Sequence, residues 1–541
     1  MALTEALKRS IGGELQTDEV TLKKYSHDAS LFEIKPSAVF FPKDVDDIKH
    51  VVNVARESGG AITLTPRAGG TDMTGGSLSE SLIVDTTRYL NTIIEVRDGL
   101  AVTQPGVYYR DFEQATLKHN LLLPSYPASR EICTVGGMVG NNAGGEKTLS
   151  YGKTEKYVER LKMVLADGNA YEFHALSKKE LDTKKKQKNF EGEVYRNMYK
   201  LISKNSALIQ KARPNVTKNS AGYYLWNVWD GKTFDLTKLF VGSQGTLGIV
   251  SEITFRLVRP KTHSQLAVIF MKDMKSFVDV AHIVLKYKPE SFESFDDHTF
   301  KLAINFLPSF IKILKKNIFK LAWQFLPEFA MVLTGGIPKL ILLAEFTGDS
   351  DEEITERLET LGGELEGICS KSRIITSHDE MEKYWTIRRE SFNLLRKHIK
   401  GKRTAPFIDD LIVRVERFPE FFPRLQKLLD RYQMTYTIAG HVGDANLHII
   451  PFMDLKDLKT HTIIQKLSDE VYNLVFEFGG SMTAEHNDGL IRSPYLKKMY
   501  GEKVYKLFEE TKKIFDPFGI FNPGKKVGAN LQYAFDHIVK E

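Results

Sequence analysis

The residues best suited to chemistry are histidines and an acidic side chain in two short polar turns near the C-terminal end of the chain. His441 and His448 lie on either side of a turn rich in Gly, Asp and Asn, between two strand-like runs. Glu485 and His486 are adjacent, with glycines and small residues around them. Because neighbouring residues of a strand point to opposite faces, Glu485 and His486 can serve one site only if the backbone turns there. Two histidines and a carboxylate are a common ligand set for catalytic zinc, manganese or iron; surface histidines without a catalytic role are the alternative.

Glycine pairs form a second group of candidate functional residues. Residues 66–76 follow a β-rich run and contain two glycine pairs around a polar turn, so their backbone N–H groups could bind a pyrophosphate. A purely structural connection is the alternative. Two common nucleotide motifs are excluded. The chain has no G-x-G spacing, which the Rossmann fingerprint requires, and residues 519–526 carry a lysine where a P-loop needs Ser or Thr.

Three further glycine-containing elements follow at residues 104–106, 134–145 and 242–248. The four elements in this order resemble the PCMH-type FAD-binding domain of the vanillyl-alcohol-oxidase superfamily. They are most similar to its D-2-hydroxyacid dehydrogenase branch, which includes D-lactate dehydrogenase, the glycolate oxidase D-subunit and D-2-hydroxyglutarate dehydrogenase. The resemblance extends from about residue 36 to about residue 525.

The resemblance implies that FAD is bound by two α+β subdomains, with its pyrophosphate on the first glycine loop. Several related oxidases attach the flavin to a histidine in that loop. Thr71 occupies the position here, so we expect non-covalent FAD. The implied FAD-binding residues are Pro66, Arg67, Ala68, Gly69, Gly70, Thr71, Asp72, Gly75, Gly76, Pro105, Gly106, Thr134, Gly136, Gly137, Asn141, Ala143, Gly144, Gly145, Gly248, Ile249, Val250 and Asn522.

The first histidine turn resembles the family's G-H-x-G-D-x-N-x-H motif. His441 and His448 match its histidines, and Ala445 stands where a glycine is common. The resemblance implies that both histidines bind a divalent metal, zinc in the first instance, with manganese or iron as alternatives. Asn446 would contact the substrate or help to shape the metal site.

The second turn resembles the family's G-E-H-G motif. Ala484 and Asn487 replace the glycines that usually flank the Glu–His pair. The resemblance implies that Glu485 is the third metal ligand and that His486 is the catalytic base.

The implied reaction is the oxidation of a D-2-hydroxy acid, in which a hydride leaves Cα for the flavin while the hydroxyl loses its proton. A metal lowers the pKa of that hydroxyl, and an imidazole accepts the proton. Arg388 lies in a segment that resembles the family's W-x-x-R-E, with Arg389 in place of the glutamate. Arg388 is our candidate to bind the substrate carboxylate, and an ordinary basic helix face is the alternative. Ile408 stands where some members have a substrate-binding lysine, so we expect a D-lactate-like substrate rather than a dicarboxylate.

The elements that must position these residues indicate an α+β fold. Apolar spacing predicts a helix over residues 44–57. Short strands are predicted over residues 61–65, 82–85 and 252–257, and helical patterns dominate after about residue 259. We predict four parts: an N-terminal segment (1–35), a two-subdomain FAD-binding domain (36–260), an α+β cap domain with an antiparallel sheet of the FAD-linked oxidase C-terminal type (261–505), and a C-terminal segment that returns to the FAD-binding domain (506–541).

Composition restricts the partners. The net charge of +6 over 541 residues is too small to indicate nucleic-acid binding. Two cysteines exclude a four-thiolate iron–sulfur cluster within this chain, and the nicotinamide fingerprint is absent. A quinone or an electron-transfer protein is therefore the expected electron acceptor. The first residues do not resemble a signal peptide, so we expect a cytoplasmic protein.

Two lysine-rich segments remain. Residues 303–338 combine apolar residues with a helical-spaced stripe of Lys312, Lys315, Lys316 and Lys320. This pattern is typical of a helix in a membrane interface, which would place the protein peripherally on the cytoplasmic face; a helix packed on the cap domain is the alternative. The run at residues 181–189 predicts a solvated loop, with partner binding as the alternative.

Two other functions remain open. The first is that of the flavin-dependent alkyl-transferring synthase of ether-lipid synthesis, which shares the scaffold that this sequence resembles and performs no net redox turnover. The second is that of a protein that binds FAD only as a structural or partner-docking element.

Overall fold

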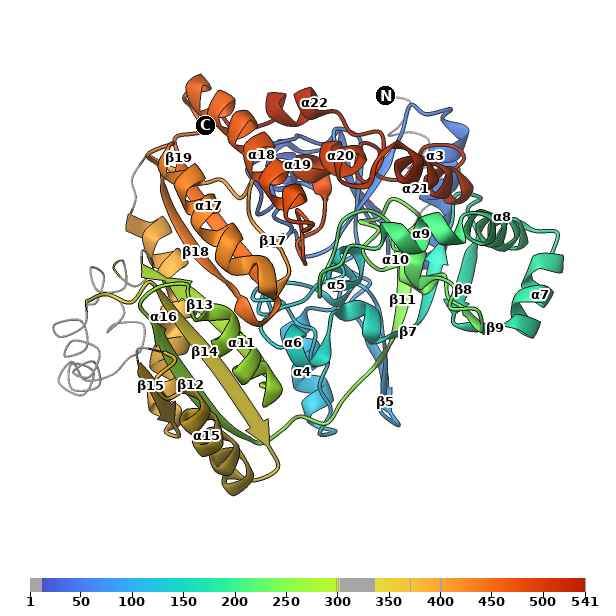
Figure 1. Ribbon diagram of the computed structural model, residues 1–541. Helices are drawn as coiled ribbons and strands as arrows, with labels where there is room; N and C mark the ends of the chain where they lie inside the picture. The colour runs from blue at the N-terminus through green and yellow to red at the C-terminus, as the bar shows by residue number, and fades with distance from the viewer. Residues whose placement is uncertain are drawn as a thin grey trace.

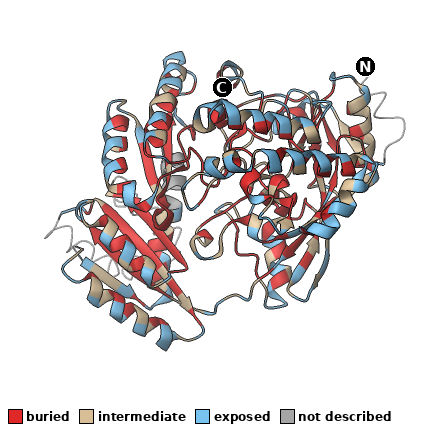
Figure 2. Ribbon diagram, turned by 45° about the vertical axis from the view of Figure 1, so that its right-hand side comes forward, coloured by how far each residue is buried: buried red, intermediate tan, exposed pale blue. Residues whose placement is uncertain are grey.

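The computed structural model contains, within its described residues, three large sheets and one two-stranded sheet, formed by residues 176–177 and 233–234, with helices around them (Figure 1). Most strands and the inward faces of the helices are buried, whereas the outward helix faces and some edge strands are exposed (Figure 2). The described residues are 12–297, 299, 301, 336–369, 371–398 and 401–540. Almost all of the basic segment 303–338, including its four lysines, lies outside them.

The first sheet has four strands in the order β1-β2-β4-β3. β4 is parallel to β2 and β3, whereas β1 is antiparallel to β2. The helix predicted over residues 44–57 is confirmed as α3, whose N-terminal amides donate to the side chain of Asp44. The strand predicted at 82–85 is confirmed, but the one predicted at 61–65 begins only at Leu64, because its partner β4 begins at Leu82. The elements are β1 (Glu14–Gln16), α2 (Glu19–Tyr25), β2 (Ala38–Phe41), α3 (Val45–Glu57), β3 (Leu64–Arg67) and β4 (Leu82–Asp85).

The second sheet is antiparallel, with five strands in the order β5-β6-β11-β7-β8. Its central strand β11 covers residues 252–256 of the strand predicted at 252–257 and begins three residues earlier. The elements are β5 (Ile93–Arg97), β6 (Leu100–Thr103), α4 (Tyr109–Leu117), α5 (Val135–Asn141), α6 (Thr148–Tyr151), η1 (Thr154–Lys156), β7 (Val158–Val164), β8 (Ala170–His174), β9 (Leu176–Ser177), α7 (Lys178–Lys186), α8 (Phe190–Lys204), α9 (Ser206–Ala212), η2 (Leu225–Asn227), β10 (Thr233–Phe234), α10 (Thr237–Phe240) and β11 (Ile249–Arg256).

The prediction of a loop at residues 181–189 was wrong, because helix α7 extends to Lys186. Ser177 and Glu180 form a capping box that satisfies the first amides of the helix. Lysines in its last turn lie at the negative end of the helix dipole, where positive charge is favourable. The lysine run therefore belongs to a helix end.

The third sheet is antiparallel, in the order β15-β12-β14-β13-β18-β19-β16, and β17 also pairs with β19. Helices α11, α15, α17 and α18 share one apolar core with one face of this sheet. Phe292 faces that core, so its neighbour Glu293 points to the other face. The elements are β12 (His263–Met271), α11 (Phe277–Lys286), β13 (Ser291–Asp296), β14 (Leu340–Gly348), α15 (Asp351–Leu365), β15 (Lys371–Ile375), α16 (His378–His398), β16 (Arg403–Thr404), β17 (Leu411–Ile412), η3 (Val415–Arg417), α17 (Phe418–Asp430), β18 (Thr435–His441), η4 (Val442–Asp444), β19 (Asn446–Met453) and α18 (Leu458–Glu477).

The last part of the chain returns to the first sheet. After α21 ends, Phe521 pairs in parallel with Leu64 of β3, and the backbone amide of Asn522 donates to the Leu64 carbonyl at 2.8 Å. Figure 1 shows α20 and α21 on the side of the molecule that carries α8 and α9. The elements are α19 (Gly489–Arg492), η5 (Ser493–Tyr495), α20 (Leu496–Tyr500), α21 (Glu502–Phe515) and α22 (Leu531–Asp536).

Within the described part of the chain, we find no helix with the length and apolar character needed to cross a bilayer.

Candidate active site

A β-hairpin brings His441 and His448 together. His441 ends β18 and pairs with Asn446, while His448 on β19 pairs with Ala439 two residues earlier on β18. The two imidazole ring centroids are 5.1 Å apart. The predicted strand–turn–strand is confirmed. Ala445, at the position where the family commonly has glycine, adopts the left-handed conformation with φ of 52°, and its methyl group is buried in the apolar core.

A backbone turn presents Glu485 and His486 to this hairpin, as the sequence predicts. The N–H groups of Ala484, Glu485 and His486 all donate to Oδ2 of Asp410, at 2.8, 2.8 and 2.7 Å. The hydroxyl of Thr483 donates to the same oxygen at 2.7 Å. Three consecutive amides pointing at one anion make a nest of the kind that also binds phosphates. One buried carboxylate therefore shapes the turn that carries both functional side chains.

The three predicted metal ligands meet at this point. Oε1 of Glu485 lies 2.9 Å from Nε2 of His441 and 3.3 Å from Nε2 of His448. Ligand atoms from all three residues lie within 4.8 Å of one another. Each histidine places its other nitrogen on a carboxylate: Nδ1 of His441 is 2.6 Å from Glu293, and Nδ1 of His448 is 3.1 Å from Asp409. Because carboxylates accept Nδ1–H, they leave the Nε2 lone pairs available for an ion. The residues present therefore fit a divalent metal.

The electrostatics of the site favour a cation. Burial alone would lower the pKa of His448, but Asp409 and Glu485 raise that pKa to about 10. Burial would likewise lower the pKa of His441, yet Glu293 and Glu485 raise it above its ordinary value. Burial would raise the pKa of Glu485, but His441 and then Lys218 hold it well below the ordinary range. The carboxylates thus create a negative potential that either imidazolium protons or a metal ion can neutralise.

His486 lies beside the ligand set. Its Nδ1 is 2.7 Å from Oδ2 of Asp409, and its ring stacks on His448 with centroids 4.8 Å apart. It is the most exposed of the three histidines, with 23% of its side chain accessible against 10% for His441 and 14% for His448. Among the described residues, no hydrogen bond engages its Nε2. This geometry suits a base whose outer nitrogen meets a ligand.

Arg388 on α16 reaches the same site through Glu293. Its Nη2 lies 3.0 Å from Glu293 Oε2, and its Nε is buried without a hydrogen-bond partner among the described residues. The neighbouring Arg389 instead pairs with Glu146, at 2.7 and 2.8 Å. Ile408 is completely buried in the apolar core of the third sheet, so its side chain brings no charge to the site.

Asn446 is also completely buried. Its Nδ2 donates to Oδ1 of Asp410 at 3.1 Å and to the Leu411 carbonyl at 3.2 Å. Of the two roles that the resemblance allows, this contact corresponds to shaping the site.

The first predicted FAD-binding element is the loop that follows β3. The residues from Ala68 to Met73 are partly exposed, and Gly70 and Gly75 adopt left-handed φ values of 67° and 80°. Asp72 accepts hydrogen bonds from within the loop, including one from the Thr74 hydroxyl. The guanidinium of Arg67 turns away to the carbonyls of residues 25 and 27. The loop therefore offers mainly backbone groups to a cofactor.

Helix α5 carries the third predicted element. Thr134 caps it by accepting from Gly137 N at 3.2 Å, and Gly136 N donates to the Pro105 carbonyl at 2.8 Å. A Cβ placed on Gly140 would meet no described atom within 4 Å. Gly140 therefore leaves its side of the helix open, whereas a Cβ on Gly136 would lie 2.5 Å from Pro105, and an open helix face of this kind fits a dinucleotide cofactor such as FAD.

The other predicted FAD-binding residues serve the packing around these elements. Gly106 and Gly145 lie so close to backbone carbonyls that a Cβ would clash. Ala143 and Ile249 are buried, Val250 is half-buried, and Gly248 precedes β11. Asn522 is fully buried, and its amide donates to the carbonyls of Gly76 and Gln244 at 2.8 and 2.7 Å. The side chain of Asn522 therefore braces the glycine loop.

Helix α5 and the Glu485 turn are in direct contact. Nδ2 of Asn141 donates to the Glu485 carbonyl at 2.9 Å. A Cβ on Gly144 would lie 3.1 Å from Glu485 Oε2. Lys218 places its Nζ 3.2 Å from the same oxygen, and Lys153 donates to the Ala484 carbonyl at 2.9 Å. These contacts converge on the turn that carries the predicted metal ligand.

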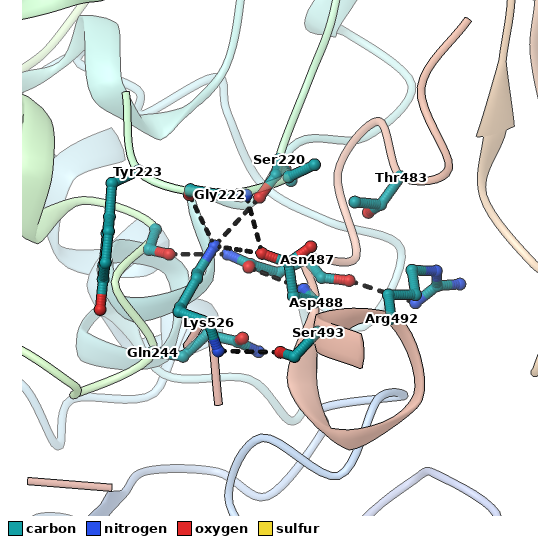
Figure 3. Close-up of polar contacts among 12 residues, drawn as sticks. Ser220, Gly222, Tyr223, Gln244, Thr483, Asn487, Asp488, Arg492, Ser493 and Lys526 are labelled. Atoms are coloured by element: carbon teal, nitrogen blue, oxygen red, sulfur yellow. Dashed lines mark hydrogen bonds and ion pairs between the residues drawn. The ribbon is translucent and has the colours of Figure 1, made fainter. Parts of the chain in front are cut away.

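Figure 3 shows the polar contacts of a second part of the junction. The side chains of Lys526, Asp488 and Asn487 there are completely buried. Lys526 pairs with Asp488 at 2.7 Å and also donates to the carbonyls of Ser220 and Gly222 at 3.1 and 2.9 Å. Asn487 occupies a position where the family has glycine and has a left-handed φ of 72°. Its amide donates to the Asn141 and Gly242 carbonyls, each at 3.0 Å. The C-terminal tail and both glycine-rich segments thus hold the turn from one side.

Several residues of the site were not singled out from the sequence. Asp409, Asp410 and Glu293 contact the predicted histidines and their turn, and Lys218 and Lys153 contact Glu485 and its neighbour. Single acidic residues and lysines without a motif carry no local signal. The only signal available was the position of Asp409 and Asp410 beside Ile408, in a stretch that resembles a substrate-binding segment.

Comparisons with known proteins identify two family domains in this chain. The family described as FAD binding domain matches residues 36–174, and the family described as FAD linked oxidases, C-terminal domain, matches residues 260–526. D-2-hydroxyglutarate dehydrogenase of Pseudomonas putida is 29% identical over 96% of this chain and 51% of its own length. Glycolate oxidase subunit GlcD of Bacillus subtilis is 26% identical over 93% of this chain and 91% of its own. D-lactate dehydrogenase of Archaeoglobus fulgidus is 24% identical, with 90% of both chains covered. The chain spans about half the length of the first curated relatives it matches.

Solved structures show the same fold. A 4-ethylphenol oxidase from Gulosibacter chungangensis superposes with a TM-score of 0.68 and 17% identity, covering 97% of both chains. An alkyldihydroxyacetonephosphate synthase superposes with a TM-score of 0.66 and 13% identity, covering 94% of this chain and 82% of the other. The architecture is thus an FAD-binding domain of two α+β parts followed by an α+β domain built on an antiparallel sheet. The chain therefore carries an FAD-binding domain and the C-terminal domain of FAD-linked oxidases, and the curated relatives that it resembles are the oxidoreductases named above.

Proposed function

We propose that this protein oxidises a D-2-hydroxy acid to the 2-oxo acid, using non-covalent FAD and a divalent cation held by His441, His448 and Glu485. The observation that carries the proposal is the contact between Asn141 of the glycine-rich helix and the Glu485 carbonyl at 2.9 Å. This contact connects the helix surface that fits a flavin with the three residues that fit a metal ion. A substrate bound at the metal would then lie next to the cofactor.

Each side chain has a distinct role in this proposal. FAD, when bound, accepts the hydride, and the cation, when bound, lowers the pKa of the substrate hydroxyl. His486 Nε2 takes the hydroxyl proton, because its Nδ1 is already on Asp409 at 2.7 Å. Arg388 offers its buried, unbonded Nε to the substrate carboxylate while Glu293 holds its Nη2 at 3.0 Å.

The substrate we propose is a monocarboxylate of the D-lactate type. Four of the first curated relatives are named D-2-hydroxyglutarate dehydrogenase, an enzyme named for a dicarboxylate. Ile408, where some family members have a substrate-binding lysine, is buried in an apolar core here. Without a cation at that place, a second substrate carboxylate would lose its partner.

Electrons would leave the reduced flavin for a quinone or an electron-transfer protein. The chain has two cysteines, Cys133 and Cys369, which are too few for a four-thiolate cluster. Zinc is the metal we propose first, since a set of two histidines and a carboxylate is typical of its catalytic sites. Manganese and iron bind similar sets.

The test is anaerobic reduction of the bound flavin by a panel of D- and L-2-hydroxy acids, with and without a chelator. We expect D-lactate and similar D-monocarboxylates to bleach the flavin faster than D-2-hydroxyglutarate, and metal removal to slow the reaction. If no hydroxy acid bleaches the flavin of the metal-loaded protein, the proposal is wrong. The alkyl-transferring synthase and the non-catalytic flavoprotein would then remain.

A matched pair of histidine variants tests the base. We expect His486→Ala to slow flavin reduction by roughly 10²–10⁴-fold with an unchanged FAD spectrum. His537→Ala is the control, because His537 lies at the end of α22 and its imidazole hydrogen-bonds to the Tyr533 carbonyl and to Glu80 rather than to the histidine site. Unchanged turnover in His486→Ala would remove this residue from the mechanism.

A further inference from the structure

We propose that Asp409 is a positioning residue that orients a metal ligand and the catalytic base with one carboxylate. Its Oδ1 lies 3.1 Å from Nδ1 of His448, and its Oδ2 lies 2.7 Å from Nδ1 of His486. The Asp409 side chain is completely buried. The inference deepens the proposed function and rests on it for the roles of the two histidines.

The two contacts determine which nitrogen of each ring carries hydrogen. An ionised carboxylate only accepts hydrogen bonds, so both Nδ1 atoms must be donors. The Nε2 lone pair of His448 is then directed to the ligand set, 3.3 Å from Glu485 Oε1. The Nε2 lone pair of His486 is left for the substrate proton. Because the rings of His448 and His486 contact the same Asp409 carboxylate, they stack with their planes 25° apart.

Asp409 is itself held firmly. Arg492, which is completely buried, donates to the Asp409 carbonyl at 2.5 Å and to the Asn487 carbonyl at 3.2 Å. The next residue, Asp410, has a left-handed φ of 69° and directs its carboxylate to the backbone of residues 484–486. Two adjacent acids therefore have separate tasks, since Asp409 orients imidazoles and Asp410 orients the turn.

His441 provides an internal reference. Its Nδ1 is on Glu293 at 2.6 Å, so its tautomer does not depend on Asp409. A change at Asp409 should therefore weaken one metal ligand of three and disturb the base, while the other two ligands keep their contacts. A general collapse of the site would affect all of them.

The decisive variant is Asp409→Asn, alone and combined with His486→Ala. The Asn carbonyl can accept from one ring only, and its amide group then faces the other Nδ1 as a donor. We expect the zinc affinity, measured by competition with a chelating dye, to fall about 10–100-fold. We expect kcat at saturating metal to fall at least as far, with KM changed much less. In the His486→Ala background the loss of affinity should persist, whereas Asp409→Asn should cause little further loss of kcat.

Two outcomes would overturn the inference. Unchanged zinc affinity in Asp409→Asn would show that Asp409 does not orient the metal ligand His448. An equal loss of kcat with or without His486 would show that Asp409 does not act through the base. The control is Asp235→Asn, which alters a buried carboxylate that accepts from Thr237 away from the histidines. We expect it to leave zinc affinity and kcat unchanged.

A measurement on the wild type keeps the inference testable even if Asp409→Asn folds poorly. In the zinc-loaded protein with ¹⁵N-labelled histidine, both His448 and His486 should show Nδ1–H tautomers, assigned with His448→Ala and His486→Ala. An Nε2–H tautomer at either residue refutes the role of Asp409 there. Failure of every hydroxy acid to bleach the flavin would refute the proposed function instead, while zinc affinity and tautomers would still report on Asp409.

Discussion

Neutralising Asp410 should loosen the turn that carries Glu485 and His486. Four hydrogen bonds end on its Oδ2, from the Thr483 hydroxyl and the amides of residues 484–486, at 2.7 to 2.8 Å. A fifth, from Asn446 Nδ2, ends on Oδ1 at 3.1 Å. Asp410→Asn keeps the volume but removes the charge. If the side-chain carbonyl of the new Asn at position 410 keeps the bonds to the turn, its NH₂ group faces the NH₂ group of Asn446. Two donors then meet without an acceptor.

The expected cost follows from these contacts. Hydrogen bonds to a charged group contribute about 1.5–3 kcal/mol and neutral ones about 0.5–1.5 kcal/mol, so four bonds lose roughly 1 kcal/mol each. The fifth bond, from Asn446, is lost altogether and adds about 1.5–3 kcal/mol, so we expect a total loss of about 5–7 kcal/mol in the free energy of unfolding. Proteins have about 5–15 kcal/mol in total. The variant should therefore be strongly destabilised, with a weakened metal site.

Urea unfolding gives the global loss, and hydrogen exchange read by mass spectrometry gives the local one. We expect faster exchange in the peptide that contains residues 484–486 and lower zinc affinity. Asp235→Asn is again the reference, because its carboxylate accepts two hydrogen bonds, both from Thr237. A loss below ~1 kcal/mol in Asp410→Asn, with unchanged exchange, would refute the idea that this charge holds the turn.

Three further predictions concern the junction around Glu485. Gly144→Ala places a Cβ 2.7 Å from the Thr148 hydroxyl oxygen and 3.1 Å from Glu485 Oε2; we expect a loss of about 1–3 kcal/mol in urea unfolding, together with weaker zinc binding, and unchanged values would contradict the packing. Asn487→Gly relieves a left-handed φ but removes three hydrogen bonds; we expect a net loss of about 1–3 kcal/mol, and a gain would show that strain dominates. Burial lowers the pKa of Lys153 from 10.5 to about 8. Between these values the unfolded chain binds more protons, so this lysine should make stability rise with pH by about 3 kcal/mol. Urea unfolding at pH 7.5, 9 and 10 should show this rise in the wild type relative to Lys153→Met, and a fall would contradict it.

The parts of the site that the sequence predicted are those with a local cause. The hairpin around residues 441–448 follows from alternating apolar residues with a turn between them. Helix α3 follows from apolar spacing and an Asp cap. The turn at residues 484–486 was required for Glu485 and His486 to serve one site, and the structure contains it. The prediction of a loop at residues 181–189 was wrong for a reason that is also local, because a capping box begins a helix there despite the lysine run.

By itself, the sequence determined the residue types of the site, the hairpin that carries two histidines and the glycine-rich elements, because spacing along the chain encodes them. Only the tertiary structure decided which side chains surround the site. Asp409 and His486 are 77 residues apart, and Lys218 and Glu485 are 267 apart. Their contacts depend on sheet register and on how the glycine-rich part packs against the antiparallel sheet. Such long-range packing is the combined result of many buried contacts, and no short motif records it.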